Sequence, residues 1–247
     1  MAKRSMTDAA LRWHVFPDSA ALTQALVGRI VRSAQTAIVD RQVFRMVLSG
    51  GSTPRMLYAT LADTDSAWAG WRLYFTDERC LPAGDPDRND AMARSAWLDS
   101  VPIDDEHVFS IPAEFGPEQG ASAYAEVLAG VGQFDVTLLG LGEDGHTASL
   151  FPGHPLGDAA TASDALGVTD APKRPPMRVS MSANRLSHSH ETLVIVTGAG
   201  KRDAVRSWYR GADVPIAAVR PAAGMDIFLD AAAAAPELPA TLITSGT

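Results

Sequence analysis

The chain of 247 residues contains a single cysteine, Cys80. One cysteine excludes an intrachain disulfide and fits a protein of a reducing cytosol. We expect Cys80 to be a half-buried residue rather than a catalytic nucleophile.

Long apolar runs are also missing. No segment approaches the roughly 18 uninterrupted apolar residues of a membrane-spanning helix. The opening stretch, "MAKRSMTDAALRW", is basic but lacks the apolar core of a secretory signal. We therefore expect a cytoplasmic protein that has no membrane partner.

Positive charge is in deficit, because 21 lysines and arginines face 29 aspartates and glutamates, for a net charge of −8. Binding to a nucleic acid backbone needs a basic face, so we expect no nucleic acid partner. A few local cations can still dominate a pocket, and a small anionic substrate remains compatible with the overall charge.

Several catalytic signatures are absent as well. Neither Ser52 nor Ser149 lies in a Gly-x-Ser-x-Gly elbow, there is no Walker sequence, and no cysteine and histidine spacing indicates zinc. His188 and His190 would point the same way on a strand, but two histidines alone make a poor metal site. We expect neither a metal nor a cofactor.

What the sequence does contain is an alternation of strands and helices. Apolar or alternating segments predict strands at 12–16, 43–49, 71–77, 134–140, 177–183, 192–198 and 225–230. Helices are predicted after Asp18, after Pro54, over about 89–99 and over 201–209, with one closing helical turn at 231–236. This alternation predicts an α/β fold, a doubly wound and mostly parallel sheet with helices on both faces, in a single domain over 1–247. Residues 154–176 are small, polar and Pro-rich, so we expect a long loop that is functional or mobile.

In such sheets ligands bind outside the carboxyl ends of the strands, so the loops after residues 48, 76, 139 and 197 carry the candidate sites. The first reads "LSGGSTPRML". Gly50 and Gly51 permit a tight turn, Ser52 or Thr53 can cap the next helix, and Pro54 suits the first helical position. Free N–H groups and the helix dipole then predict a phosphate site. The alternative is a well-capped helix that binds nothing.

Cations follow two further strands. In "YFTDERCLP", Arg79 could bind a phosphate through two hydrogen bonds, and Asp77 could orient it or contact a sugar hydroxyl. In "VTGAGKRDAV", Lys201 or Arg202 could supply a second phosphate cation. The alternative for Asp77 and Arg79 is a cluster of salt bridges on the surface. The alternative for Lys201 and Arg202 is that they are basic residues on a solvated helix.

The stretch "GLGEDGHTASLF" satisfies Gly-x-Gly-x-x-Gly through Gly140, Gly142 and Gly145, the pattern of a dinucleotide site. Glu143 and Asp144, however, place negative charge where a pyrophosphate needs backbone N–H groups. The acidic residue expected about twenty positions later at a strand end is also missing, since "ATASDALGVTD" shows no strand. We reject a dinucleotide site.

The same turn instead presents Asp144 and His146 at the carboxyl end of a strand. Imidazole is suited to general base work near neutral pH, and a carboxylate two residues away can fix its tautomer and stabilise the imidazolium. A lone histidine is more often structural, but this one lies in a Gly-rich loop beside an acid. We therefore interpret His146 as a catalytic base.

Together these segments resemble the 6-phosphogluconolactonase family, the lactone hydrolases of the oxidative pentose phosphate pathway. The resemblance covers nearly the whole chain, from "LSGGSTP" through "TDERCLP", "GLGEDGHTASLFPGHP", "PPMRVSMSANRL" and "VTGAGKRDAV". The related amino-sugar phosphate deaminases carry a similar glycine and histidine turn with a different tail. The tail "TASLFP" after His146 favours the lactonase.

The resemblance implies hydrolysis of 6-phospho-D-glucono-1,5-lactone by a monomer or weak dimer. It implies that His146 activates water with Asp144 as its support. The residues it implies as the phosphate grip are Gly50, Gly51, Ser52, Thr53, Arg79 and, as a less certain helper, Lys201 or Arg202. Asp77 and Asn89 are the candidate contacts to the sugar, and backbone N–H groups of the 140–147 turn are the candidate oxyanion donors.

One departure from the family concerns the segment "PDRNDAMAR". Many relatives have a Ser-Asn pair there, whereas this chain has Arg88 before Asn89. The contacts of that loop are therefore open. Two other functions also remain open, namely a sugar-phosphate isomerase or deaminase and a non-catalytic sugar-phosphate sensor. A sensor would normally need an output module, and no helix-turn-helix extension is evident.

Overall fold

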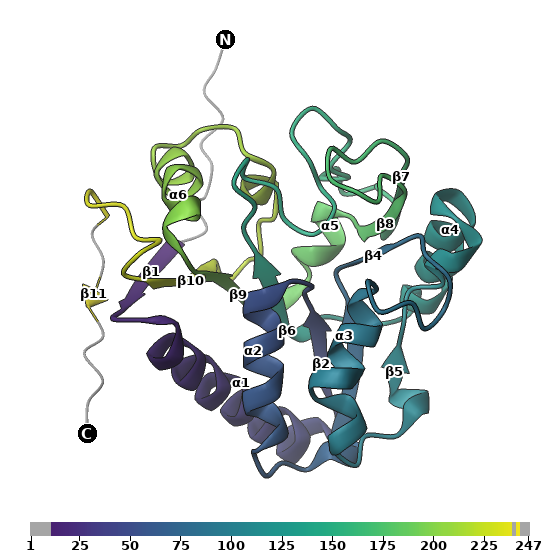
Figure 1. Ribbon diagram of the computed structural model, residues 1–247. Helices are drawn as coiled ribbons and strands as arrows, with labels where there is room; N and C mark the ends of the chain where they lie inside the picture. Colours follow the sequence, from purple (N-terminus) through teal and green to yellow (C-terminus); the bar gives the residue numbers. More distant parts are fainter. Residues whose placement is uncertain (1–10, 239–240, 243–247) are drawn as a thin grey trace.

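The computed structural model describes residues 11–238 and 241–242, and its centre is a sheet of eight parallel strands (Figure 1). The strand order across the sheet is β11-β1-β10-β9-β6-β2-β3-β5. The strands are β1 (Leu11–Phe16), β2 (Phe44–Leu48), β3 (Trp71–Phe75), β5 (Val108–Phe109), β6 (Phe134–Gly140), β9 (Ser189–Val196), β10 (Met225–Asp230) and β11 (Thr241–Leu242). Every predicted strand of the parallel sheet is present, within a few residues of its predicted bounds.

The direction of winding reverses between β2 and β6, which are neighbours in the sheet. After β2 the chain moves through β3 to β5 at one edge, and after β6 it moves through β9 to β10 on the other side. A doubly wound sheet has a crevice at such a reversal, outside the carboxyl ends of the two strands. The loops after β2 and β6 therefore flank one crevice, although about ninety residues separate them in sequence.

The α-helices connect these strands. They are α1 (Ser19–Arg41), α2 (Ser52–Ala62), α3 (Asn89–Ala96), α4 (Pro117–Leu128), α5 (Ala183–Leu186) and α6 (Arg202–Tyr209). Right-handed crossovers place α1, α2 and α3 on one face of the sheet, the front face in Figure 1, and α5 and α6 on the other. Short 3-10 turns complete the connections: η1 (Trp68–Gly70), η2 (Leu98–Ser100), η3 (Asp105–His107), η4 (Ala113–Phe115), η5 (Ala199–Lys201) and η6 (Pro215–Ala218).

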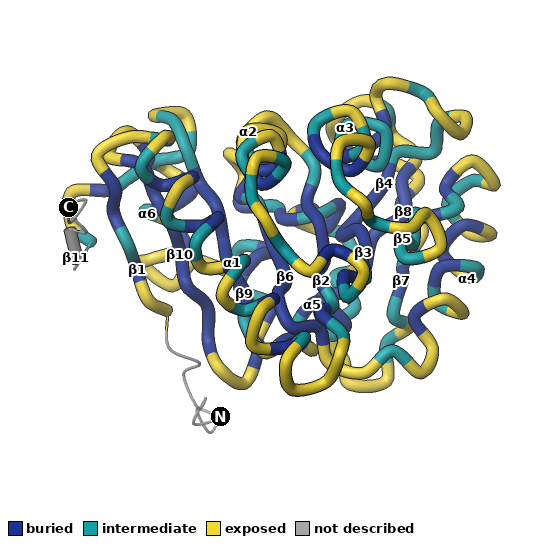
Figure 2. The backbone as a smooth tube through the Cα atoms, turned by 90° about the horizontal axis from the view of Figure 1, so that it is seen from below, coloured by how far each residue is buried: buried dark blue, intermediate teal, exposed yellow. Residues whose placement is uncertain are grey.

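Helix α1 begins as the sequence predicts, because the side chain of Asp18 accepts a hydrogen bond from the N–H of Ala21 at 2.8 Å. Its buried residues include Leu22, Leu26 and Ile30, which recur at helical spacing and pack on the sheet. The central strands β6 and β10 are buried on both faces, while the connecting loops are exposed (Figure 2). None of the helices in the described residues is both long and apolar enough to cross a membrane.

A second, antiparallel sheet lies beside the carboxyl end of the main one and was not predicted. It has the order β4-β8-β7, with β4 (Asp77–Arg79), β8 (Arg178–Met181) and β7 (Ala165–Val168). The prediction of one strand over 71–77 was wrong in its end, because β3 stops at Phe75 and β4 starts a new sheet. The segment 177–183 does contain a strand, but it pairs with β4 and β7 rather than joining the parallel sheet.

Two further predictions need correction. The predicted loop over 154–176 contains β7. The predicted helical turn in the segment 231–236 is present as a single turn, in which the N–H of Ala234 donates to the carbonyl of Asp230 at 3.1 Å. Helix α3 ends at Ala96, so the predicted helix to 99 is completed only by the 3-10 turn η2. Helix α4 was not predicted at all.

Candidate active site

A cavity of about 290 Å³ lies outside the carboxyl ends of β2 and β6, at the reversal of winding. Its walls come from the loops after β2, β4 and β6, from the segment before β8, and from the start of η5–α6. The lining residues are Ser49, Gly50, Gly51, Asp77, Arg79, Asn89, Gly140, Leu141, Gly142, His146, Thr147, Ala148, Lys173, Arg174, Arg178 and Lys201. We call this cavity the switch-point pocket.

His146 enters the switch-point pocket from a closed turn after β6. The N–H of Gly142 donates to the carbonyl of His146 at 2.7 Å, and the N–H of Gly145 donates to the carbonyl of Gly142 at 3.0 Å. Gly145 has φ of +84°, which favours glycine at this position. These two amides are thus occupied within the turn, which removes them from the predicted set of oxyanion donors. The imidazole packs against the ring of the buried Phe151, with the ring centroids 4.8 Å apart.

The Nδ1 atom of His146 forms a short hydrogen bond with a carboxylate oxygen of Asp144. Because an ionised carboxylate can only accept, Nδ1 carries the proton and Nε2 is left as the basic nitrogen. The same oxygen of Asp144 accepts the backbone N–H of His146 at 3.2 Å. Asp144 therefore fixes both the tautomer and the orientation of the imidazole, as the sequence predicts.

The protonation states of this pair suit a base. Burial lowers the pKa of His146, and the hydrogen bond and charge of Asp144 only partly oppose that shift. Burial acts to raise the pKa of Asp144, but the hydrogen bond and charge of His146 prevail and lower it. At neutral pH the pair is thus a carboxylate beside a neutral imidazole, which is ready to accept a proton.

The loop after β2 brings backbone groups to the pocket. Gly51 has φ of +110° and is the residue before α2, and within the described residues no side chain caps this helix start. The prediction that Ser52 or Thr53 caps α2 is therefore wrong. The hydroxyl of Thr53 instead lies 2.7 Å from that of Thr197, and neither Ser52 nor Thr53 lines the pocket through its side chain. The uncapped N–H groups at the start of α2 leave a site with positive potential beside Gly50 and Gly51.

Asp77 and Asn89 meet on the wall of the pocket that adjoins Gly50. The side-chain amide of Asn89 donates to the carbonyl of Asp77 at 2.8 Å, and a Cβ on Gly50 would lie 2.1 Å from the Asn89 Oδ1 atom. The carboxylate of Asp77 accepts hydrogen bonds from Thr76 at 2.9 Å and from Ser149 at 2.7 Å. Asp77 is thereby held at a fixed position in the pocket wall. No sequence pattern indicated the contribution of Ser149.

Arg79 lines the same wall, and its Nη1 atom forms a short hydrogen bond with the carbonyl of Asp87. Its Nε atom is buried and has no partner among the described residues. Burying a guanidinium N–H without a partner is costly, so a ligand oxygen at this place would be stabilised.

Arg88, the departure from the family pattern, is only 2% exposed and holds the loop that carries Arg79 and Asn89. Its guanidinium donates to both carboxylate oxygens of Asp90, to Glu114 at 2.9 Å and to the carbonyls of Leu81 and Ile111. The side chain therefore points away from the pocket and makes structural contacts that a serine could not make.

Glu78 also holds the loop that carries Arg79 and Asn89. It is fully buried, and its carboxylate accepts the backbone N–H groups of Arg79, Asn89 and Asp90 at 2.8 to 3.0 Å. Burial raises the pKa of Glu78 to about 7, against the opposing effect of these N–H groups. Two residues of the pocket wall, Arg79 and Asn89, thus depend on one buried carboxylate for their backbone positions.

Lys201 and Arg202 lie in different places relative to the pocket. Lys201 lines the pocket, whereas Arg202 donates through Nη2 to the carbonyl of Ala232 at 2.7 Å, outside it. Burial, and next the charge of Lys173, lower the pKa of Lys201. Lys173, Arg174 and Arg178 also line the pocket, and the sequence interpretation missed all three.

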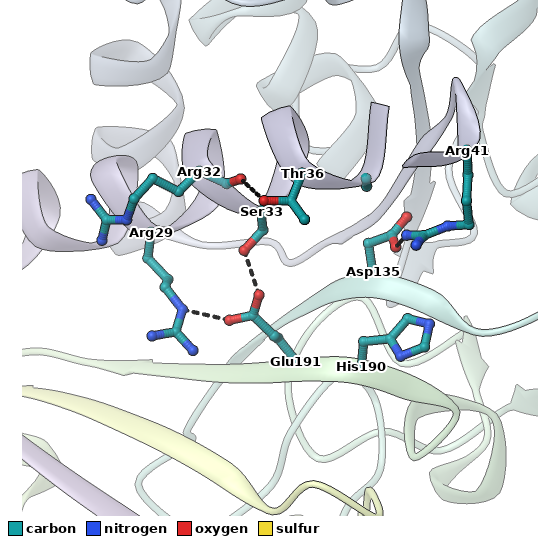
Figure 3. Close-up of a pocket in the computed structure, with 9 residues that line it drawn as sticks. Arg29, Arg32, Ser33, Thr36, Arg41, Asp135, His190 and Glu191 are labelled. Carbon is teal, nitrogen blue, oxygen red and sulfur yellow. Dashed lines mark hydrogen bonds and ion pairs between the residues drawn. The ribbon is translucent and has the colours of Figure 1, made fainter. Parts of the chain in front are cut away.

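A larger cavity, of about 370 Å³, lies at the amino ends of β6 and β9 (Figure 3). His146 follows the other, carboxyl end of β6. The larger cavity contains arginines and a histidine, but its carboxylates are already paired. Arg29 and Ser33 bind Glu191, and Arg41 and the N–H of Arg45 bind Asp135. These contacts fasten α1 to the sheet, so we assign the chemistry to the smaller switch-point pocket.

One cluster of residues in the described chain has ligand atoms within 4.8 Å of one another, as a metal site would require: Asp104, Glu106 and His107. The two carboxylates are exposed, and none of the three residues lines the switch-point pocket. This cluster does not contribute to the site described here.

Comparison with known proteins places this geometry in a family of sugar-phosphate enzymes. Residues 17–228 match the family described as glucosamine-6-phosphate isomerases/6-phosphogluconolactonase. The chain belongs to this family.

Individual relatives narrow the comparison. A protein of Streptomyces coelicolor named 6-phosphogluconolactonase is 38% identical over 92% of this chain and 95% of its own. The solved 6-phosphogluconolactonase of Trypanosoma brucei superposes with a TM-score of 0.79 at 28% identity, over 91% of this chain and 97% of its own. A monomeric glucosamine-6-phosphate deaminase superposes with a TM-score of 0.78 at 19% identity, over 90% and 98% of the two chains, and this likeness concerns the fold alone.

Proposed function

We propose that the protein hydrolyses 6-phospho-D-glucono-1,5-lactone to 6-phosphogluconate, a step of the oxidative pentose phosphate pathway. The observation that carries this proposal is a neutral imidazole, oriented by Asp144, that faces a pocket lined by cations in an otherwise acidic protein. The relatives named 6-phosphogluconolactonase cover nearly the whole chain and support the same activity.

In the proposed reaction, the Nε2 atom of His146 takes a proton from water as the water oxygen attacks the lactone carbonyl. The tetrahedral intermediate then collapses, the bond to the ring oxygen breaks, and the imidazolium returns its proton to that oxygen. Asp144 stabilises the imidazolium between the two steps. A lactone is a reactive ester, so this sequence balances with water as the sole co-reactant.

We assign the substrate phosphate to the end of the pocket formed by Gly50, Gly51, Arg79 and Lys201. The helix start at Ser52 and Thr53 contributes backbone N–H groups there. We assign the sugar hydroxyls to Asp77 and Asn89. Fixing both ends of the substrate places the carbonyl beside His146, and such positioning is itself a large source of rate acceleration.

The related deaminase chemistry is the second function to test, since both activities occur on this fold. The test is incubation of the purified protein with freshly prepared 6-phosphogluconolactone in a pH-stat. Acid release well above the spontaneous rate supports the lactonase. Release of ammonia from glucosamine 6-phosphate, without acceleration of lactone hydrolysis, would contradict it.

A further inference from the structure

The segment from Ala171 to Met177, which leads into β8, supplies two of the cations in the switch-point pocket. We call residues 171–177 the strap. Lys173 and Arg174 are exposed on the strap and line the pocket. The strap has neither helix nor strand over these residues, and the N–H of Ala171 donates to the carbonyl of Pro176 across its base at 3.0 Å. Contacts other than those of regular secondary structure must therefore hold the backbone that carries these two side chains.

Arg178 fixes the strap from beneath. Its Nε atom donates to the carbonyl of Pro175 at 3.0 Å, and its Nη2 atom donates to the carbonyls of Lys173 at 3.1 Å and Arg174 at 3.2 Å. One guanidinium thus binds three consecutive carbonyls. Arg178 is only 7% exposed, so these hydrogen bonds are shielded from water.

Arg178 is itself well anchored. It belongs to β8, opposite Arg79 in β4, and its guanidinium carbon lies 5.8 Å from the centre of the Phe151 ring. Its Nη1 atom is 4.0 Å from the carboxylate of Asp77. Phe151 also packs on His146. Arg178 and Phe151 together therefore contact the strap, His146 and Asp77.

The charges that line the pocket indicate that the strap binds an anion. The pocket lining contains five cations, Arg79, Lys173, Arg174, Arg178 and Lys201, while Asp77 is its acidic member. The charge of Lys173 acts on Lys201 and on His146, and in both cases it adds to the effect of burial in lowering the pKa. Cations crowded in this way repel one another until a multiply charged anion lies between them.

We propose that Lys173 is a specificity-determining residue that binds the phosphate of the substrate opposite Lys201, and that Arg178 is the positioning residue that holds it there. This inference rests on the proposed lactonase function for the identity of the substrate. It differs from that function in requiring a cation from the strap, where the sequence showed only a Pro-rich loop.

Lys173→Met tests the first half. The variant keeps the aliphatic stem and loses the charge, and the side chain is exposed, so the fold should be unaffected. We expect KM for the phosphorylated lactone to rise on the order of 10-fold, as for the loss of a charge-assisted contact. Turnover of glucono-δ-lactone, which has no phosphate, should change much less. Arg32→Met is the matched control, because Arg32 is an exposed arginine on α1 whose loss changes the net charge equally at the far end of the sheet.

Arg178→Gln tests the second half through a double-mutant cycle. If Arg178 acts through the strap, the double variant with Lys173→Met should show the KM of Arg178→Gln alone, because the lysine is no longer held in place. Independent effects that multiply would contradict the positioning role. Arg178→Lys, which keeps a charge but cannot bind three carbonyls, should behave like Arg178→Gln.

Binding of inorganic phosphate measured by calorimetry separates this inference from the proposed function. Phosphate should bind the wild type and the Arg32→Met control alike and bind Lys173→Met several-fold more weakly. That result would stand even if the lactone were not hydrolysed. Equal phosphate affinity and equal KM in Lys173→Met and the wild type would overturn the proposal.

Discussion

Gly142 and His146 lie in direct contact across the turn that follows β6. A Cβ atom on Gly142 would be 1.9 Å from Nδ1 of the imidazole, the atom that binds Asp144. Any side chain at this position must displace the His146 ring from its carboxylate, whereas the backbone conformation of Gly142 itself is not restricted to glycine.

We therefore expect Gly142→Ala to fold and to lose most of its turnover. Displacing the base should lower kcat by a large part of the roughly 10²–10⁴-fold that general base catalysis contributes. Gly140→Ala is the matched control, because its Cβ would meet the Ser49 hydroxyl at an ordinary 3.7 Å. Thermal melting and kcat should be compared for the two variants. Equal activity in both would mean that the position of the His146 ring does not limit the reaction.

Replacing the base directly should have the largest effect. His146→Ala should reduce kcat about 10²–10⁴-fold with the fold intact, and Asp144→Asn should reduce it less, because Asp144 orients the ring and does not transfer the proton. Since the pKa of His146 is lowered from 6.5, the neutral base persists on acidification, and kcat/KM should decline only below pH 6.5. Circular dichroism and a pH profile provide the measurements. A folded His146→Ala variant with wild-type kcat would remove this residue from the mechanism.

Arg79 should discriminate between substrates with and without phosphate. Arg79→Ala loses a charge-assisted contact worth about 1.5–3 kcal/mol, so KM for the phosphorylated lactone should rise, and kcat should fall because the phosphate also positions the carbonyl. Glucono-δ-lactone should be a poor substrate of the wild type and almost indifferent to the change. The measurement is kcat/KM for both lactones in both proteins at one ionic strength. An equal loss for both substrates would make Arg79 structural.

Glu78 should make stability depend on pH in an unusual direction for a carboxylate. Because burial raises its pKa from 4.5 in the unfolded chain to about 7, its protonated form is favoured in the fold. The contribution of Glu78 to the free energy of unfolding is fully present below pH 4.5 and is lost as the pH rises through 7. Relative to Glu78→Gln, the wild type should gain up to about 3 kcal/mol of unfolding free energy as the pH falls from 7 to 4.5. Urea unfolding across this range checks it, and a pH-independent difference would contradict it.

The parallel sheet could be predicted because its strands are nearly continuous apolar runs. "FDVTLL" and "TLVIV" are buried on both faces, and burial of this kind leaves a local signal. The rule that ligands bind outside the carboxyl ends of parallel strands then singled out the loops after residues 48, 76, 139 and 197. All four of these loops contribute residues to the switch-point pocket.

The second sheet left no comparable signal. β4 has three residues, and its partner β8 is about a hundred residues away, so only tertiary contact selects this pairing. Helix α4 did carry a signal, since Ala121, Tyr124 and Leu128 recur at helical spacing and are buried. The roles of Ser149 and Arg178 depend on contacts to residues distant in sequence, and no local pattern could indicate them.

Because of the winding of the sheet, the residues of the switch-point pocket come from two separate segments of the chain, one before and one after residues 130–132. Asp77, Arg79, Asn89 and the Gly50 turn precede the exposed glycines at 130 and 132, while the His146 turn, the strap and Lys201 follow them. A backbone cut at those glycines would leave each fragment with half a site. The fragments would recover hydrolysis only if they associated with β2 paired beside β6. Catalytic turnover would therefore report directly on the association of the two fragments.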